Sequence, residues 1–150
     1  MFNRSGSCRL RLENRTALVI AFLSVLLTSC GVSKDLQKAD QAVGDFHSQF
    51  DSEQYQSIYE GATDAFHKAT SEADFTALLQ AIHRKLGKVQ QSRRQYFHIN
   101  FNTSQGEVIS LEYSTNFDGG PGNESFVWQF DGNRPVLLSY HINSNALIMK

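Results

Sequence analysis

YFHINFNTSQGEVISLEYSTNF, residues 96–117, decides the fold of this 150-residue chain. Apolar and polar residues alternate through residues 96–102 and again through 108–117, as in strands with one buried face. The polar stretch between the two runs ends at Gly106 and has the composition of a hairpin loop. The segment therefore predicts two antiparallel strands joined by a short connection.

Two further strands follow along the chain. Residues 125–130 place Phe126, Trp128 and Phe130 on one face, and residues 136–142 form the last alternating run. We expect a Gly-rich turn at residues 118–123 and a tight turn at 131–133. The residues expected to share one face of the last strand are Val136, Leu138, Tyr140 and Ile142. Four strands in this order predict an antiparallel sheet.

Before Gly87 the apolar residues recur at helical spacing instead. Residues 35–50, 55–66 and 71–86 each carry an apolar stripe, and Gly61 marks a break in the second stripe. Helices followed by strands predict an α+β fold. We expect N-terminal helices packed on a curled four-stranded antiparallel sheet, in the order α-α-α-β-β-β-β.

The ends of these helices carry sequence signals. Asp51 followed by Gln54 resembles a capping box for the second helix. Ser71 is placed as the N-cap of the third helix, and Gly87 as its C-terminal stop.

The first 30 residues predict a leader. Four arginines precede an apolar core, Ala17–Leu27, which is shorter than the roughly 20 residues that span a bilayer. Leu27-Thr28-Ser29-Cys30 resembles the bacterial lipobox. That resemblance implies a diacylglycerol on the Cys30 thiol, palmitate-type acylation and cleavage before Cys30. Two or three acyl chains give durable anchoring.

These features predict three segments. We expect a signal peptide at 1–29 that is removed, a lipid-anchored tether at 30–34 and a single domain at 35–150. Gly31, in place of an aspartate after the lipid cysteine, favours the outer membrane over the inner one in a Gram-negative cell. Cys8 leaves with the leader and Cys30 becomes a thioether, so no disulfide or thiolate site is expected.

Charge argues against nucleic acid as a partner. The whole chain has a formal net charge of -1, and without the leader it keeps 10 basic and 14 acidic residues. A mildly acidic domain lacks the basic footprint that nucleic-acid binding needs.

The element order and the aromatic stripes resemble an NTF2-like or cystatin-like cone. More narrowly, the chain resembles small uncharacterised bacterial lipoproteins with domain of unknown function 4019. The residues that carry this likeness are Tyr55, Phe66, Phe75, Leu79, Leu86, Gly87, Arg93 or Arg94, Gly106, Tyr113, Phe117, Glu124, Tyr140, His141 and Ile142. A tryptophan usual on the last strand stands here on the preceding strand. The resemblance implies the cone, an envelope location and, because such sheets pair face to face, a homodimer.

No strong catalytic motif is present. The five histidines show no metal-binding spacing, and no nucleophile elbow or phosphate loop occurs. We therefore expect no metal, no cofactor and no catalytic residue. An enzyme with an acid or base beside a tyrosine in the cone is the alternative, by analogy with ketosteroid isomerase. Its candidate residues are Tyr55, Tyr59, Asp64, Glu112 and Tyr113.

The leading prediction is a non-catalytic binding module of the periplasm-facing cell envelope. Its partner is a small apolar ligand or an envelope protein; a purely structural role is a third reading. The expected pocket residues are Tyr55, Tyr59, Phe66, Phe97, Tyr113, Trp128 and Tyr140. A basic patch for anionic headgroups or an acidic partner is the other candidate site, formed by Arg84, Lys85, Lys88, Arg93 and Arg94.

Overall fold

A computed structural model describes residues 30–102 and 106–148 of the chain. The chain divides into two units, Met1–Asp35 and Leu36–Lys150, and the fold concerns the second. The expected signal peptide lies outside the described residues. Cys30 begins a helix, but its side chain, the expected lipid site, also lies outside what is described. Within the described part of the chain, no helix combines the length and apolarity that a membrane span requires.

Helices precede four strands, so the predicted α+β order is confirmed. A short C-terminal helix was not expected. The elements are α2 (Cys30–Asp51), α3 (Tyr55–Glu60), α4 (Asp64–Ala69), α5 (Glu72–Leu86), β1 (Val89–Asn102), β2 (Gly106–Phe117), β3 (Gly120–Asp131), β4 (Arg134–Asn143) and α6 (Asn145–Ile148).

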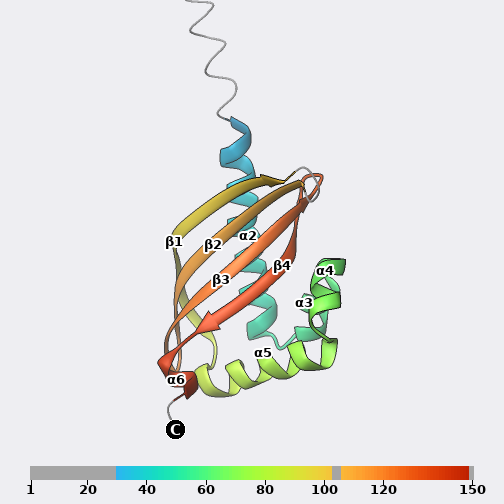
Figure 1. Cartoon of the computed structure of the whole chain (residues 1–150). Helices are drawn as coiled ribbons and strands as arrows, with labels where there is room; N and C mark the ends of the chain where they lie inside the picture. The colour runs from blue at the N-terminus through green and yellow to red at the C-terminus, as the bar shows by residue number, and fades with distance from the viewer. Residues whose placement is uncertain (1–29, 103–105, 149–150) are drawn as a thin grey trace, which may run out of the picture. The chain divides into compact units, whose positions relative to one another are not determined.

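The strands form one antiparallel sheet in the order β1-β2-β3-β4. Figure 1 shows a strongly coiled sheet with α2 running along one face and α5 crossing near one end. Tyr113 lies between Arg94 and Glu124 in register, so these three residues form a row across β1, β2 and β3. We call the face toward α2 the inner face and the opposite face the outer face.

The second predicted helix is two short helices. Gly61 ends α3, and Ala62 and Thr63 bridge to β4 before α4 begins. The expected capping box is wrong, because α3 has Gln54 at its N-cap with no side-chain hydrogen bond. Asp51 instead accepts a hydrogen bond from the Val89 backbone N–H at 3.0 Å.

The N-cap and C-terminal stop of α5 are confirmed. Ser71 accepts a hydrogen bond from the Asp74 backbone N–H at 3.2 Å. Gly87 has a φ of 72°, a conformation that favours glycine.

The Gly-rich turn is shorter than predicted. Only Asp118 and Gly119 form it, and β3 already begins at Gly120. Gly122 lies within β3 and pairs with Thr115, and an added Cβ there would meet the Phe117 ring at 3.1 Å. Glycine therefore serves close packing at this position rather than the predicted turn.

The prediction of which residues of the last strand share one face is wrong for the first half of that strand. A bulge between Val127 and Trp128 in the β3–β4 pairing shifts the register by one residue. Leu137 rather than Leu138 is therefore buried, on the same face as Tyr140 and Ile142. A bulge adds one residue to a strand, so the residues after it point to the opposite face from the one that regular alternation predicts.

Candidate functional site

A buried carboxyl group lies at the centre of the inner face. Glu124, on β3, is 2% exposed. Its Oε2 accepts hydrogen bonds from the Thr115 hydroxyl at 2.5 Å and contacts His47 Nε2 at 2.8 Å, and its Oε1 accepts one from the Tyr140 hydroxyl at 2.9 Å. We call Glu124, His47, Thr115 and Tyr140 the Glu124 cluster. Because an ionised carboxyl group only accepts, His47 Nε2 is then the donor.

The fold brings this cluster together from four elements. Thr115, Glu124 and Tyr140 come from β2, β3 and β4, and His47 comes from α2. Burial raises the pKa of Tyr140 well above its usual value, and the nearby Glu124 charge and hydrogen bond add to the shift. Tyr140 is therefore a neutral hydroxyl donor at physiological pH.

Aromatic rings close the Glu124 cluster off from solvent. The Tyr140 ring lies 4.8 Å from Phe46 and 5.2 Å from Phe126, measured between centroids. Phe46 and Phe126 are themselves 5.1 Å apart, edge to face. A cleft of about 240 Å³ lies beside this region; its lining includes Glu112 and His141 of the outer face and also Tyr113 and Glu124. Since the Glu124 side chain is 1% exposed, that cleft does not open onto its carboxyl group.

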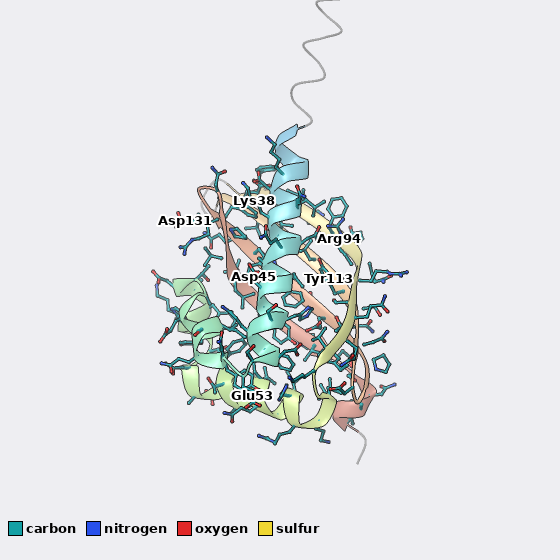
Figure 2. The ribbon with its side chains drawn as sticks, turned by 180° about the vertical axis from the view of Figure 1, so that it is seen from behind. Lys38, Asp45, Glu53, Arg94, Tyr113 and Asp131 are labelled. Carbon is teal, nitrogen blue, oxygen red and sulfur yellow. The ribbon has the colours of Figure 1, made fainter. Side chains whose placement is uncertain are left out.

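A second polar group lies beside the first. Asp40 on α2 accepts a hydrogen bond from the Tyr113 hydroxyl at 2.6 Å and forms an ion pair with Arg94. Figure 2 shows Arg94 and Tyr113 on the same side of α2. Burial, followed by the hydrogen bond to Asp40, raises the pKa of Tyr113. The Arg94 guanidinium also lies over the Phe97 ring at 5.3 Å from its centroid.

The residues expected for an enzyme do not meet. Glu112 lies on the outer face and Asp64 is exposed in the first turn of α4. Tyr59 donates to the Thr70 carbonyl at 3.0 Å. The acids beside tyrosines are Asp40 and Glu124, which were not candidates for that role.

The sequence did indicate that these two acidic residues lie on the side of their elements that faces the core. Glu124 alternates in phase with Phe126 and Trp128, so it falls on the buried face of its strand. Asp40 and His47 each lie four residues after an apolar position of the α2 stripe. The Asp40 side chain is 34% exposed, although it is a charged group.

Most expected pocket residues fill the core rather than line a cavity. Tyr55, Phe66, Tyr113 and Trp128 are each at most 8% exposed. Tyr59 and Tyr140 are partly buried and pack against the hydrophobic core. Phe97 differs, being 44% exposed. These residues therefore do not form one pocket.

A small cleft of about 170 Å³ remains between α2, α3 and the rim of the sheet. Ala42, Ile58, Trp128 and Leu137 are among its lining residues. Trp128 Nε1 is buried and has no hydrogen-bond partner among the described residues.

The expected basic patch does not form one surface. Arg93 lies opposite Ser114 on the outer face, whereas Arg94 pairs with Asp40 on the inner face. Lys85 donates to the Leu147 carbonyl at 3.1 Å. The five basic residues therefore do not share one face.

Large apolar side chains are exposed along β1 instead. Tyr96, Phe97 and Phe101 are 58%, 44% and 68% exposed. We call residues 96–102 of β1 the aromatic edge. Among the described residues no strand pairs with its outer side, because β1 ends the sheet. Exposed aromatic residues on an unpaired strand are typical of a surface that binds another chain.

Residues 42–134 match a protein family described as Protein of unknown function (DUF4019). The chain belongs to this family. The matched span includes His47, Thr115, Glu124 and the aromatic edge, while Asp40 and Tyr140 lie outside it. Among curated proteins no match is found.

Proposed function

We propose that this chain is a lipid-anchored protein of the bacterial cell envelope that acts as a non-catalytic binding module. In this proposal Cys30 carries the lipid, the domain faces the periplasm from the outer membrane, and its cone is of the NTF2-like type. The partner is a protein, and it docks on the aromatic edge.

One contrast supports this function over the alternatives. The interior of the domain is filled by aromatic side chains, and its buried carboxyl group is sealed. A catalytic acid must come within hydrogen-bond reach of a substrate, which the burial of Glu124 prevents. The other acid beside a tyrosine, Asp40, has one carboxyl oxygen bonded to Tyr113 and the other paired with Arg94. Exposed apolar side chains are concentrated elsewhere, on β1. A filled interior with an exposed aromatic surface favours protein interaction over catalysis or carriage of a ligand.

Site-specific photo-cross-linking in intact cells tests the proposal. A photoreactive amino acid replaces Phe101 in the full chain, and a matched variant carries it at Ser139, which is exposed on β4. We expect one discrete protein adduct from position 101 and none from position 139. Equal adducts from both positions, or none from either, would contradict the proposed docking surface.

A further inference from the structure

The two edges of the sheet differ in how they are protected. On β4, Ala62 bridges to Leu137, and the Thr63 backbone N–H donates to the Leu137 carbonyl at 2.9 Å. Pro135 also lacks a backbone donor on that strand. β4 is therefore partly covered and poorly suited to accept another strand.

In the part of the chain that the structure describes, the aromatic edge has none of these protections. Residues 96–102, YFHINFN, contain no charged residue, no proline and no glycine. Proteins usually protect an exposed edge strand with lysines, prolines or a covering segment, since its unpaired N–H and C=O groups accept another strand. A short, uncharged, β-prone segment on such an edge is suited to strand pairing.

This segment is complementary to itself. If two copies pair antiparallel with Ile99 opposite Ile99, then Phe97 of each copy faces Phe101 of the other. Phe97, Ile99 and Phe101 lie on the inner face, because they pair with Leu111, Ile109 and Glu107. Three apolar cross-strand pairs would then line one face of the joined sheet, the arrangement that stabilises neighbouring strands.

The charges near the aromatic edge permit this register. With Ile99 at the two-fold axis, the paired stretch runs from Tyr96 to Asn102, and Arg93 and Arg94 lie before it, beyond the register shift between Arg94 and Tyr96. No like charges lie opposite one another, and such contacts would oppose pairing. The outer face is less suitable for face-to-face pairing, because its central row consists of the polar residues Glu112, Ser125 and His141.

We propose that the partner at the aromatic edge is a second copy of this chain, joined through β1 to β1 with Ile99 on the two-fold axis. The two sheets then continue across the interface as one eight-stranded antiparallel sheet. This pairing is isologous, so it closes as a dimer. The inference rests on the proposed function, whose docking surface it shares.

Cysteine cross-linking of the full chain in cells tests the register. Directly opposed residues of paired antiparallel strands lie about 4.5–5.5 Å apart between Cα atoms, within disulfide reach. We expect Ile99→Cys to give a disulfide dimer on mild oxidation. Gln95→Cys is the matched control, because its two copies would lie roughly 26 Å apart along the strands. The parent chain, with only Cys8 and Cys30, measures the background.

A mixed experiment keeps the test informative if Ile99→Cys folds poorly. Phe97→Cys and Phe101→Cys are each placed in a separately tagged chain. We expect a mixed disulfide when both chains are present and little when either is alone, because identical positions lie about 13 Å apart. Phe101→Glu, at an exposed position, should weaken self-association of the purified full chain roughly tenfold.

The outcomes separate this inference from the proposed function. Dimers at position 99 but not 95, together with the mixed disulfide, support the second copy. Equal dimers at 95 and 99 overturn the register. A photo-adduct at Phe101 with a different protein, without dimers at 99, overturns the second copy and leaves the proposed function standing. A lipid adduct, or no adduct and no dimer, overturns both.

Discussion

Glu124 is the residue on which the most buried polar contacts depend. Three donors converge on its carboxyl group from α2, β2 and β4. Because the group is 2% exposed, none of these donors has water as a ready alternative partner. The cluster therefore fixes how α2 sits on the sheet, which suits a structural role for a polar group in an aromatic core.

Truncating this side chain should be costly. We expect Glu124→Ala to lower the free energy of unfolding by about 3–5 kcal/mol, because it leaves His47, Thr115 and Tyr140 without their acceptor. Glu112→Ala, at an exposed outer-face position, should change it by less than about 0.5 kcal/mol. Urea denaturation of both variants measures the difference, and equal effects would show that the cluster contributes no stability.

Two buried tyrosines predict a loss of stability in alkali. The pKa values of Tyr113 and Tyr140 are raised in the folded protein from the ordinary value of 10.0. Below pH 10 both forms keep the proton; above it the unfolded chain loses protons that the folded chain retains. The stabilisation is therefore lost as pH rises from 10 toward the folded pKa values.

Denaturation at a series of pH values checks this prediction. The stability of the parent chain should fall with pH above 10, and the double variant Tyr113→Phe, Tyr140→Phe should show a shallower fall. The variant is expected to be less stable at neutral pH, so the slopes rather than the absolute values are compared. Parallel slopes would mean that other groups cause the alkaline loss.

At the scale of helices and strands, two glycines can be compared because only one of them is required by its conformation and surroundings. Gly87 ends α5 at a φ of 72°, and an added Cβ would meet the Asp118 carboxyl oxygen at 2.6 Å. Gly44 lies within α2, and nothing lies within 4 Å of an added Cβ there.

These positions predict opposite effects of alanine. Gly87→Ala should destabilise the fold by more than about 1 kcal/mol, through both backbone strain and the collision. Gly44→Ala should stabilise it by about 0.5–1 kcal/mol, since alanine favours the helix interior. Thermal denaturation of the two variants tests the contrast. A stabilising Gly87→Ala would contradict the described end of α5.

Periodicity predicted the elements but not their details. The apolar stripes located α2, α5 and the four strands, because burial of one face imposes a period on the sequence. The first half of β1 was not predicted, because the stretch QQSRRQ at residues 90–95 is polar throughout and shows no alternation of apolar and polar residues. The bulge opposite Leu138 and the strand glycine Gly122 depend on tertiary packing, so sequence pattern could not reveal them.

The candidate site was predicted least well. Exposure of Phe97 and Phe101 depends on where the helices leave the sheet uncovered, and strand alternation assigns both to a buried face. Predicting the Glu124 cluster would have required knowing that residues 47, 115, 124 and 140 come together in the fold. Only the phase of Glu124 with its apolar neighbours pointed to its burial.

At the scale of the whole molecule, the proposed anchor makes a prediction of its own. Cys30→Ser should move the full chain from the membrane fraction to a soluble or uncleaved form, because the thiol that accepts the lipid is lost. Cys8→Ser, within the proposed leader, should leave membrane association unchanged. Fractionation and mass measurement of the N-terminus check both variants, and identical behaviour would argue against lipidation at Cys30.

In our proposal the aromatic edge is occupied in the cell. Hydrogen–deuterium exchange of the full chain tests it most directly, in native envelope and in dilute purified form. We expect the amides of residues 96–102 to exchange slowly in the envelope and much faster in dilute solution, while those of β4 change little. Equal exchange of residues 96–102 in both states would contradict it.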